Sequence, residues 1–285
     1  MKNIADYDQE IRQDPNNAEL YRLRGIEYYQ KGDYDRGMMD YDQANMLNPS
    51  CAKTYNCRGV AYRRKGDLDR AIKDFDQAIQ LDPNFARPYI NRGIAFELKD
   101  DSDRAVADYG KAIQIDPKDA DAYFNRGGVY STSGYAYLHG ENDIARGNAF
   151  LDRAITDYNQ AIKIDSNNAE FYVYRGMAYY SKKDFDQAIM DFDQAIRINP
   201  NYADAYWQRG NAYREKKDFD QAIADFNQTL QLDPKHVLTY NDRALVYCFD
   251  IGDYAKAIAD WEVVLQLNPN NSTARMNIER AKRKM

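Results

Sequence analysis

Glycine and aromatic residues recur along the chain with a period of 34 residues, and their spacing predicts helices. When each period is counted from Ala18 as position 1, position 4 is tyrosine in all seven full periods and position 11 is always aromatic. Position 8 is glycine in six periods and alanine in the last. At 100° per residue these positions share one stripe of a helix. The small residue lets a second backbone approach closely, which must offset the ~1 kcal/mol that glycine costs inside a helix.

A second run follows in each period and predicts a second helix. An aspartate such as Asp33 usually stands where an N-cap belongs. Alanine (Gly37 in the first period), an aromatic residue and another small or apolar residue then follow one turn apart. An Asp-Pro or Asn-Pro step ends most runs, since proline disfavours α-conformation in the residue before it. Each period is therefore predicted to hold two short antiparallel helices, called helix A and helix B below.

Seven of the eight prolines keep the same rhythm. They are Pro15, Pro49, Pro83, Pro117, Pro200, Pro234 and, one residue late, Pro269. The gap of 83 residues between Pro117 and Pro200 is two periods plus a 15-residue insertion, with Ser166 in place of the missing proline. A fixed period of this length indicates a stack of small units rather than one globular core.

The order tyrosine, glycine, aromatic, then alanine, aromatic, alanine and proline resembles the tetratricopeptide repeat (TPR) family over almost the entire chain. The resemblance implies an all-α fold: a right-handed α-solenoid (superhelix) of antiparallel helix pairs, whose A helices line a concave groove for a partner's peptide. We expect a single array over 1–285, with an N-terminal half repeat at 1–17 and a C-terminal capping helix at 272–285. The seven repeats are expected at 18–51, 52–85, 86–119, 120–168, 169–202, 203–236 and 237–271.

Composition narrows the class of protein. The net charge of −6 does not favour nucleic-acid binding, and 44% apolar residues argue against disorder. Three cysteines without a CxxC pair predict reduced thiols. The chain has no apolar run near 18 residues, so no membrane insertion is expected. Its first residues lack the apolar stretch of a secretory leader, which predicts a cytoplasmic location unless a leader has been removed.

Two charged positions are invariant across the seven periods. Position 7 is Arg24, Arg58, Arg92, Arg126, Arg175, Arg209 and Arg243, and position 23 is Asp40, Asp74, Asp108, Asp157, Asp191, Asp225 and Asp260. A residue present in every unit is most simply structural, so we predict a ladder of arginine–aspartate pairs between helices. The alternative is a row of arginines that grips an acidic ligand.

Binding residues are expected where the periods differ, on the face of helix A opposite the packed stripe (positions 2, 5, 6, 9, 12 and 13). In the early periods this face is basic, and the candidates for an acidic peptide are Arg22, Lys53, Asn56, Arg63, Arg87 and Asn91. Some TPR proteins grip a C-terminal carboxylate with lysine, asparagine and arginine. Ile26 stands where that set has asparagine, so such a clamp is at best partial here.

In the later periods the same face is expected to be apolar and aromatic. Its candidates are Asn125, Tyr174, Met177, Tyr180, Trp207, Asn211 and Arg214. Exposed aromatic residues with arginine and few acids are typical of a binding hot spot. We therefore expect this part to hold apolar anchors of the partner.

The 15-residue insertion falls near 131–148, between helices A and B of the fourth repeat. Gly134 and Gly140 are expected to interrupt the chain there, and helix B is expected to start about two turns early, after Asn142. Tyr135, Tyr137 and His139 would lie in the lead-in as contact candidates. Two interpretations stay open: a protruding hairpin whose rings pack on its own helices, or a lip or docking knob at the groove. A metal site with Glu141 and Asp143 is not expected, because the second histidine lies far along the array.

The chain lacks the motifs of common catalytic sites. A Gly-rich phosphate loop, HExxH, paired CxxC and a nucleophile elbow are all absent from the sequence. An open solenoid rarely supplies a water-excluding pocket, so neither an enzyme nor a cofactor is expected. The first hypothesis is a non-catalytic adaptor that binds a protein or peptide. The alternatives are self-assembly through the terminal repeats into a homo-oligomer, and, disfavoured by the acidic charge, single-stranded RNA binding.

Overall fold

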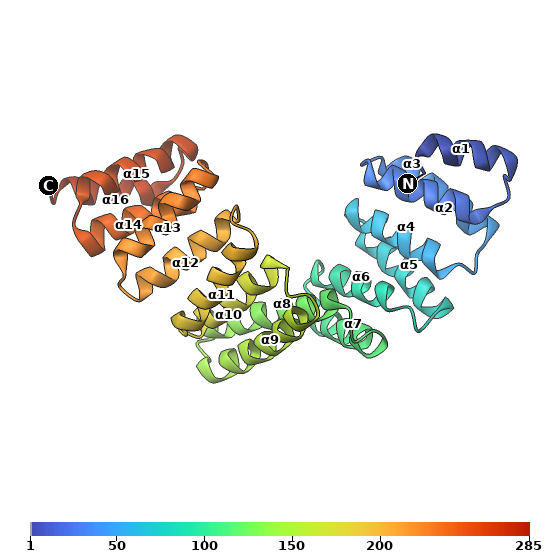
Figure 1. Ribbon diagram of the computed structural model, residues 1–285, viewed down its shortest axis with the longest axis horizontal. Coiled ribbons are helices and arrows are strands. Elements are labelled where there is room, and N and C mark those ends of the chain that lie inside the picture. Colours follow the sequence, from blue (N-terminus) through green and yellow to red (C-terminus); the bar gives the residue numbers. More distant parts are fainter. Residues whose placement is uncertain (1) are drawn as a thin grey trace. The chain divides into compact units, whose positions relative to one another are not determined.

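The computed structural model describes residues 2–285, and these residues form helices without any strand (Figure 1). Two compact units divide the chain, the first up to Val129 and the second from Tyr130, so the boundary falls inside one helix. Each unit is a succession of antiparallel helix pairs. The predicted all-α solenoid of helix pairs is therefore confirmed.

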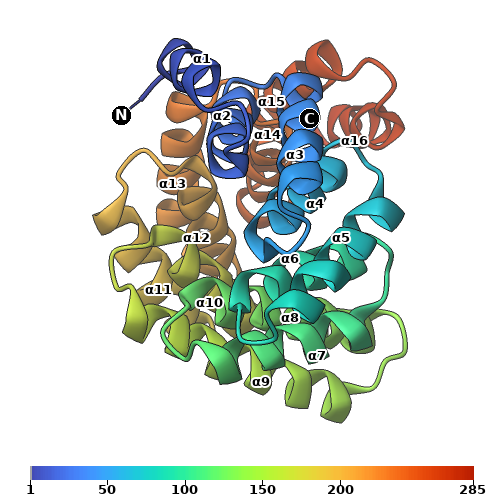
Figure 2. The same cartoon turned by 90° about the vertical axis from the view of Figure 1, so that its right-hand side faces the viewer.

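Unit 1 begins with a single helix, which packs on the first A helix. The helices of unit 1 are α1 (Ile4–Gln13), α2 (Ala18–Gln30), α3 (Tyr34–Leu47), α4 (Ala52–Arg64), α5 (Leu68–Leu81), α6 (Ala86–Glu97), α7 (Ser102–Ile115) and the first half of α8 (Ala120–His139). The A helices α2, α4 and α6 each pack on the B helix that follows, and α2 also contacts α4, as α4 contacts α6. Figure 2 shows these helices in succession from blue to green.

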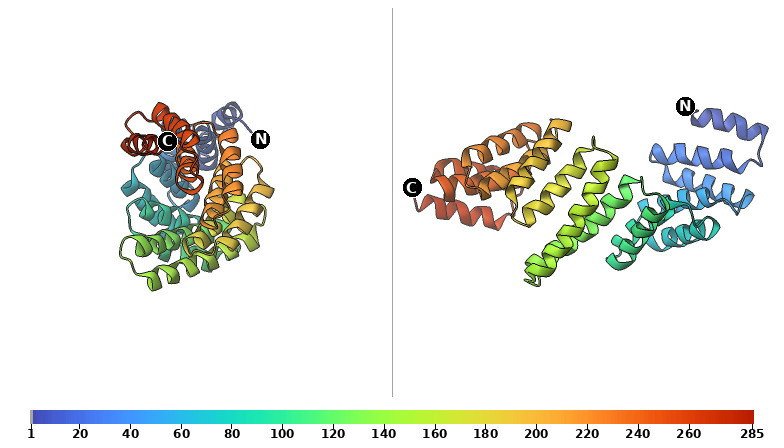
Figure 3. Two further views of the ribbon diagram at one scale, coloured as in Figure 1. Left: turned by 90° about the vertical axis from the view of Figure 1, so that its left-hand side faces the viewer. Right: turned by 60° about the horizontal axis from the view of Figure 1, so that its bottom comes forward.

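Unit 2 repeats this plan after the second half of α8. Its helices are α9 (Ile144–Ile164), α10 (Ala169–Ser181), α11 (Phe185–Ile198), α12 (Ala203–Glu215), α13 (Phe219–Leu232), α14 (Val237–Leu245), a π-helical segment η1 (Val246–Ile251), α15 (Tyr254–Leu267) and α16 (Ser272–Lys282). They can be followed from green to red in Figure 3. The last helix, α16, buries Ala274, Ile278 and Ala281 against α15 and leaves its basic end exposed.

Glycine and a ring form the contact within each helix pair. A Cβ placed on Gly59 would lie 2.6 Å from the ring of Phe75, and one on Gly176 would lie 2.7 Å from Phe192. Both rings are completely buried. The A-helix glycine is therefore required by the aromatic residue of helix B, which explains why both recur together.

The insertion lengthens both helices of the fourth repeat instead of adding a loop. Helix α8 continues through Gly134 to His139, so the prediction that Gly134 interrupts the chain and that Tyr135 and Tyr137 lie in a lead-in is wrong. The early start of helix B is confirmed, because α9 begins at Ile144. One added heptad in each helix and one added residue in the turn account for the whole insertion.

The added heptads repeat the scaffold's own packing contact. A Cβ on Gly134 would lie 2.8 Å from Leu151 Cγ and 3.0 Å from the carbonyl oxygen of Gly147. On Gly25 of the first repeat it would meet the ring of Tyr41 and the carbonyl oxygen of Gly37 in the same way. Because seven residues are close to two helical turns, a heptad returns the chain to nearly the same face.

The late proline also has a structural cause. One extra residue separates Pro234 from Pro269, and the A helix of this last repeat changes from α to π geometry at Val246–Ile251. A π-turn absorbs a single inserted residue without breaking the helix. Gly252, with φ of 85°, then ends the segment in a left-handed conformation.

Candidate protein-binding faces

The invariant arginines of position 7 are bound to the invariant aspartates of position 23. Within six repeats Arg Nε donates to Asp Oδ2 at 2.8 Å and Arg Nη2 donates to Oδ1 of the same carboxylate. The six pairs are Arg24–Asp40, Arg58–Asp74, Arg92–Asp108, Arg175–Asp191, Arg209–Asp225 and Arg243–Asp260. The predicted ladder is confirmed in these repeats. Arg126 belongs to unit 1 and Asp157 to unit 2.

The third nitrogen of each of these arginines reaches the preceding B helix. Arg58 Nη1 donates to Asp42 at 2.7 Å, and Arg92 Nη1 donates to Asp76 at 2.5 Å. Arg175 and Arg243 use asparagines, Asn159 and Asn227, in the same place. Each guanidinium thus joins its own repeat to the previous one, and each of its three nitrogens already donates to a scaffold side chain. This disfavours the alternative in which these arginines bind the partner.

A second set of contacts joins neighbouring A helices. Asn91 Nδ2 donates to Asn56 Oδ1 at 2.9 Å in unit 1, and both side chains are buried. In unit 2, Trp207 Nε1 donates to Asp242 Oδ2 at 2.8 Å. In each case position 5 of one repeat bonds to position 6 of the next. Helical angles alone place both positions on the open groove, yet the A helices lie close enough for these side chains to meet.

At the six face positions of its A helices, unit 1 has more cations than acids: Arg22, Lys53, Arg63, Arg64 and Arg87 against Glu19, Glu97 and Asp121. Lys53 is exposed, Arg64 Nε donates to the hydroxyl of Tyr29 at 3.1 Å, and Arg87 is 47% exposed. Arg87 also pairs with Asp119 and Asp121, at 3.2 and 2.9 Å. Of the predicted residues in this unit, Lys53 and Arg87 lie most open to a partner.

Three further candidates lie in unit 1 and are partly covered. Arg22 is bound by Glu19 of its own helix. Arg63 is half-buried, its Nε has no hydrogen-bond partner, and burial lowers the pKa of its guanidinium. Asn125 is half-buried on α8.

The A-helix face of unit 2 is aromatic, as expected, but it is also acidic. Tyr174 and Met177 are each 37% exposed, whereas Tyr180 and Trp207 are half-buried. Acidic residues occupy the same face at Glu170, Asp204, Glu215 and Asp242. The expectation of few acids here is therefore wrong. All four acids stand at face positions 2, 6 or 13, where the sequence already shows them.

Buried polar groups stabilise the centre of this face. Burial raises the pKa of Asp242, while hydrogen bonds from Trp207 and Asn241, and the nearby Arg214, oppose the rise. Arg214 Nε donates to Asp250 at 3.1 Å. Trp207 thus joins α12 to α14, and Arg214 joins α12 to η1, in addition to any contact with a partner.

Models of one repeat family match most of this chain. A tetratricopeptide repeat model matches 18–51, another matches 52–85 and 203–236, and a TPR repeat model matches 101–134, 150–183 and 176–216. The chain belongs to the tetratricopeptide repeat family. No curated protein sequence matches it.

Several solved structures share the fold. The chain of an APC/C Cut9–Hcn1 hetero-tetramer is 22% identical with a TM-score of 0.66, and the match covers 98% of this chain but 52% of that one. YrrB, described as a TPR protein with an unusual peptide-binding site, is 21% identical over 70% of this chain and 95% of its own, with a TM-score of 0.55. PilF of Pseudomonas aeruginosa is 17% identical over 79% of this chain and 95% of its own, with a TM-score of 0.65. This TPR chain thus spans about half the length of the Cut9–Hcn1 chain it matches.

The tip of the long α8–α9 hairpin packs on its own helices. Tyr137 stacks on Phe150 with ring centroids 5.4 Å apart, and the guanidinium of Arg146 lies 4.3 Å from the Tyr137 centroid. Tyr135 is 58% exposed and contacts the ring of His139. Of the three predicted contact residues, Tyr137 therefore belongs to the hairpin's own packing, whereas Tyr135 and His139 are exposed.

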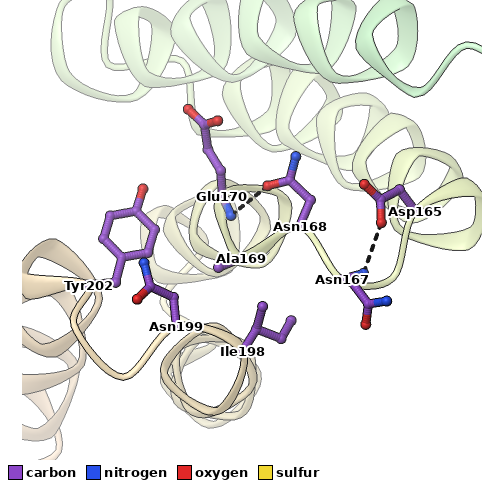
Figure 4. Close-up of a pocket in the computed structure, with 8 residues that line it drawn as sticks. All are labelled: Asp165, Asn167, Asn168, Ala169, Glu170, Ile198, Asn199 and Tyr202. Carbon is purple, nitrogen blue, oxygen red and sulfur yellow. Dashed lines mark hydrogen bonds between the residues drawn. The ribbon is translucent and has the colours of Figure 1, made fainter.

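A shallow pocket of unit 2 lies beside the first turn of α10 (Figure 4). Its polar residues already serve the local backbone: Asp165 accepts from the amide of Asn167 at 3.0 Å, and Asn168 caps α10 by accepting from the amide of Glu170 at 3.0 Å. The side chains of Glu170 and Tyr202 extend to the same side of the pocket (Figure 4). The pocket is thus the edge of the acidic face rather than a separate site.

Two other kinds of site are not found in the described part of the TPR array. Residues 2–285 contain no group of three histidine, cysteine or acidic side chains placed to hold a metal ion. Within the same residues no helix combines the length and apolar character needed to cross a bilayer.

Proposed function

We propose that this TPR chain is a non-catalytic scaffold that binds a segment of a partner protein along its A helices. One observation carries the proposal. The residues shared by the repeats form the ladder and the core. Exposed A-helix residues such as Lys53, Arg87, Tyr174 and Met177 differ between repeats and are accessible to a partner. Variable exposed residues on a rigid scaffold are where specificity resides.

In unit 1 the proposed partner segment is acidic. Lys53 and Arg87 are exposed on the successive A helices α4 and α6, and the half-buried Ile26 and Ile94 stand at face positions of α2 and α6. A carboxylate of the partner can compete with Asp121 for Arg87, because that pair is solvent-exposed and hence weak. A disordered segment loses entropy on binding, so an affinity near the micromolar range is expected, roughly −8 kcal/mol.

Affinity capture from the source cell's lysate tests the proposal. Lys53→Glu/Arg87→Glu and Tyr174→Ala/Met177→Ala are compared with wild type, and captured proteins are quantified by mass spectrometry. Lys111→Glu/Lys118→Glu is the matched charge control, because both lysines are exposed in unit 1 outside the A helices. Each A-helix variant should lose partners that the control retains. Full retention by both A-helix variants overturns the proposal.

Self-assembly through the terminal repeats stays a prediction. The solvent-facing residues of α1 are polar or small, including Asp6, Gln9, Arg12 and Gln13, so this helix would present a polar surface to a second subunit. Sedimentation velocity over a concentration series tests self-assembly. A strict monomer at tens of micromolar excludes it, and a concentration-dependent dimer supports it.

A further inference from the structure

The A-helix face of unit 2 has an excess of carboxylates. Glu170 and Asp204 lie in the first turns of α10 and α12, and Glu215 lies at the end of α12. All three are exposed. Arg214 is the sole cation at the six face positions of α10, α12 and α14, and its Nε is already bonded to Asp250. Of the lysines that follow these helices, Lys182 and Lys216 pair with Asp152 and Asp186 of the B helices. Lys183 and Lys217 are exposed in the turns, outside the six face positions.

These carboxylates and the aromatic residues form one surface. Burial raises the pKa of Tyr202 to about 12, and the charges of Glu170 and Asp204 add to the rise. The pKa of Tyr180 is also about 12, again mainly because of burial, with Glu215 adding to it. Glu170 and Tyr202 line the same pocket edge (Figure 4). Negative charge therefore surrounds the exposed rings and the Met177 side chain.

Such a surface has a specific chemical preference. A cationic side chain is attracted both to the face of an aromatic ring and to a carboxylate. An acidic partner would meet repulsion here, since like charges across an interface are unfavourable. The scaffold already shows the geometry, because Arg209 lies 5.5 Å from the centroid of Tyr206.

We propose that the A-helix face of unit 2 binds a basic segment of a partner protein, whose lysine or arginine side chains pair with Glu170, Asp204 and Glu215 while its apolar residues pack on Tyr174 and Met177. The inference rests on the proposed scaffold function and names the chemistry of the partner for this unit. It is opposite in sign to the chemistry proposed for unit 1.

Fluorescence anisotropy with the full chain tests the inference. The probes are a fluorescein-labelled, glycine- and serine-rich peptide of about 16 residues that carries lysines and leucines, and its twin with glutamate in place of each lysine. The basic probe should bind wild type at least about tenfold more tightly than the acidic probe binds the unit 2 face. In the variant Glu170→Lys/Asp204→Lys/Glu215→Lys, the affinity for the basic probe should fall about tenfold. The acidic probe's contact with unit 2 is isolated by using the Lys53→Glu/Arg87→Glu background.

The matched control is Asp220→Lys/Glu262→Lys/Glu279→Lys. These three exposed acids belong to α13, α15 and α16 of the same unit, outside its A helices, and their reversal changes the net charge equally. It should weaken the basic probe less than about twofold. Equal weakening by both variants means general attraction to an acidic protein and overturns the inference. Equal affinity of the basic and acidic probes for the Lys53→Glu/Arg87→Glu background also overturns the inference.

The outcome is separable from that of the proposed function. If Tyr174→Ala/Met177→Ala loses captured partners while the unit 2 charge reversal behaves as its control, the scaffold function stands and the basic specificity is wrong. If neither A-helix variant loses partners, the scaffold proposal itself fails. A second copy of the chain as occupant would show as dimerisation that the unit 2 charge reversal abolishes, and this too would overturn the inference.

Discussion

Units 1 and 2 have the same scaffold and opposite exposed chemistry. In both, a glycine of helix A packs on a ring of helix B, and an arginine joins two B helices through one guanidinium. On the exposed face of helix A, unit 1 presents Lys53 and Arg87, whereas unit 2 presents Glu170 and Asp204 beside Tyr174. The comparison shows that a repeat scaffold fixes the positions of exposed residues without fixing their charge.

The largest expected effect tests whether the scaffolds are equivalent. Arg58→Ala in unit 1 and Arg209→Ala in unit 2 each leave a buried aspartate, Asp74 or Asp225, without its partner. Each should lower the free energy of unfolding by about 3 kcal/mol, measured by urea denaturation. A clear difference between the two losses would show that the ladder is not equivalent in the two units.

The second effect concerns the two added heptads of the long α8–α9 hairpin, which lie in unit 2. Gly134→Ala places a methyl group against Leu151 and the backbone of Gly147, so it should destabilise the chain by about 1–3 kcal/mol. Gly128→Ala in the same helix has no atom within 4 Å and should be neutral or stabilising by up to ~1 kcal/mol. Equal thermal melting of the two variants would argue that the added heptads do not pack as the scaffold does.

The third effect compares the contacts between neighbouring A helices. Asn91→Ala in unit 1 leaves the amide of Asn56 unsatisfied, and Trp207→Phe in unit 2 leaves Asp242 without its best donor. Each should cost about 1–2 kcal/mol, with the larger loss in unit 2, where the acceptor is a carboxylate. Asn56→Leu/Asn91→Leu removes both polar partners and should cost less than Asn91→Ala; a larger loss would contradict the assigned pair.

The smallest effect is a pH dependence specific to unit 2. Burial raises the pKa of Asp242 in the folded chain above its value in the unfolded chain, so this carboxyl contributes more stability as the pH falls through the raised pKa. As the pH falls from 7 to about 4, the free energy of unfolding of Asp242→Asn should therefore decrease relative to that of wild type, by less than about 1 kcal/mol. Urea denaturation of both proteins at pH 7 and at pH 4 measures the difference.

Much of the scaffold follows from sequence because its signals are local and repeated. The glycine–aromatic spacing, the aspartate caps and the Asp-Pro ends determined the helix pairs, and the invariance of Arg58 and Asp74 determined their pairing. The insertion was harder, since Gly134 looks like a helix break. A signal was nonetheless present in the sequence: Gly134, Tyr137 and Arg146 stand one heptad from residues of the same type, Gly127, Tyr130 and Arg153.

Sequence alone determined the repeat period, the helix pairs and the ladder, because each depends on contacts at fixed separations along the chain. Only the tertiary structure decided which A-helix residues stay exposed. Helical angles place Asn56, Asn91 and Trp207 on an outer face, but they do not give the distance to the next A helix, which is short enough for Asn91 to bond to Asn56 and for Trp207 to bond to Asp242. Packing between repeats therefore removed these side chains from the open surface and left Lys53 and Arg87 in unit 1, and Glu170, Asp204 and Tyr174 in unit 2, to meet a partner.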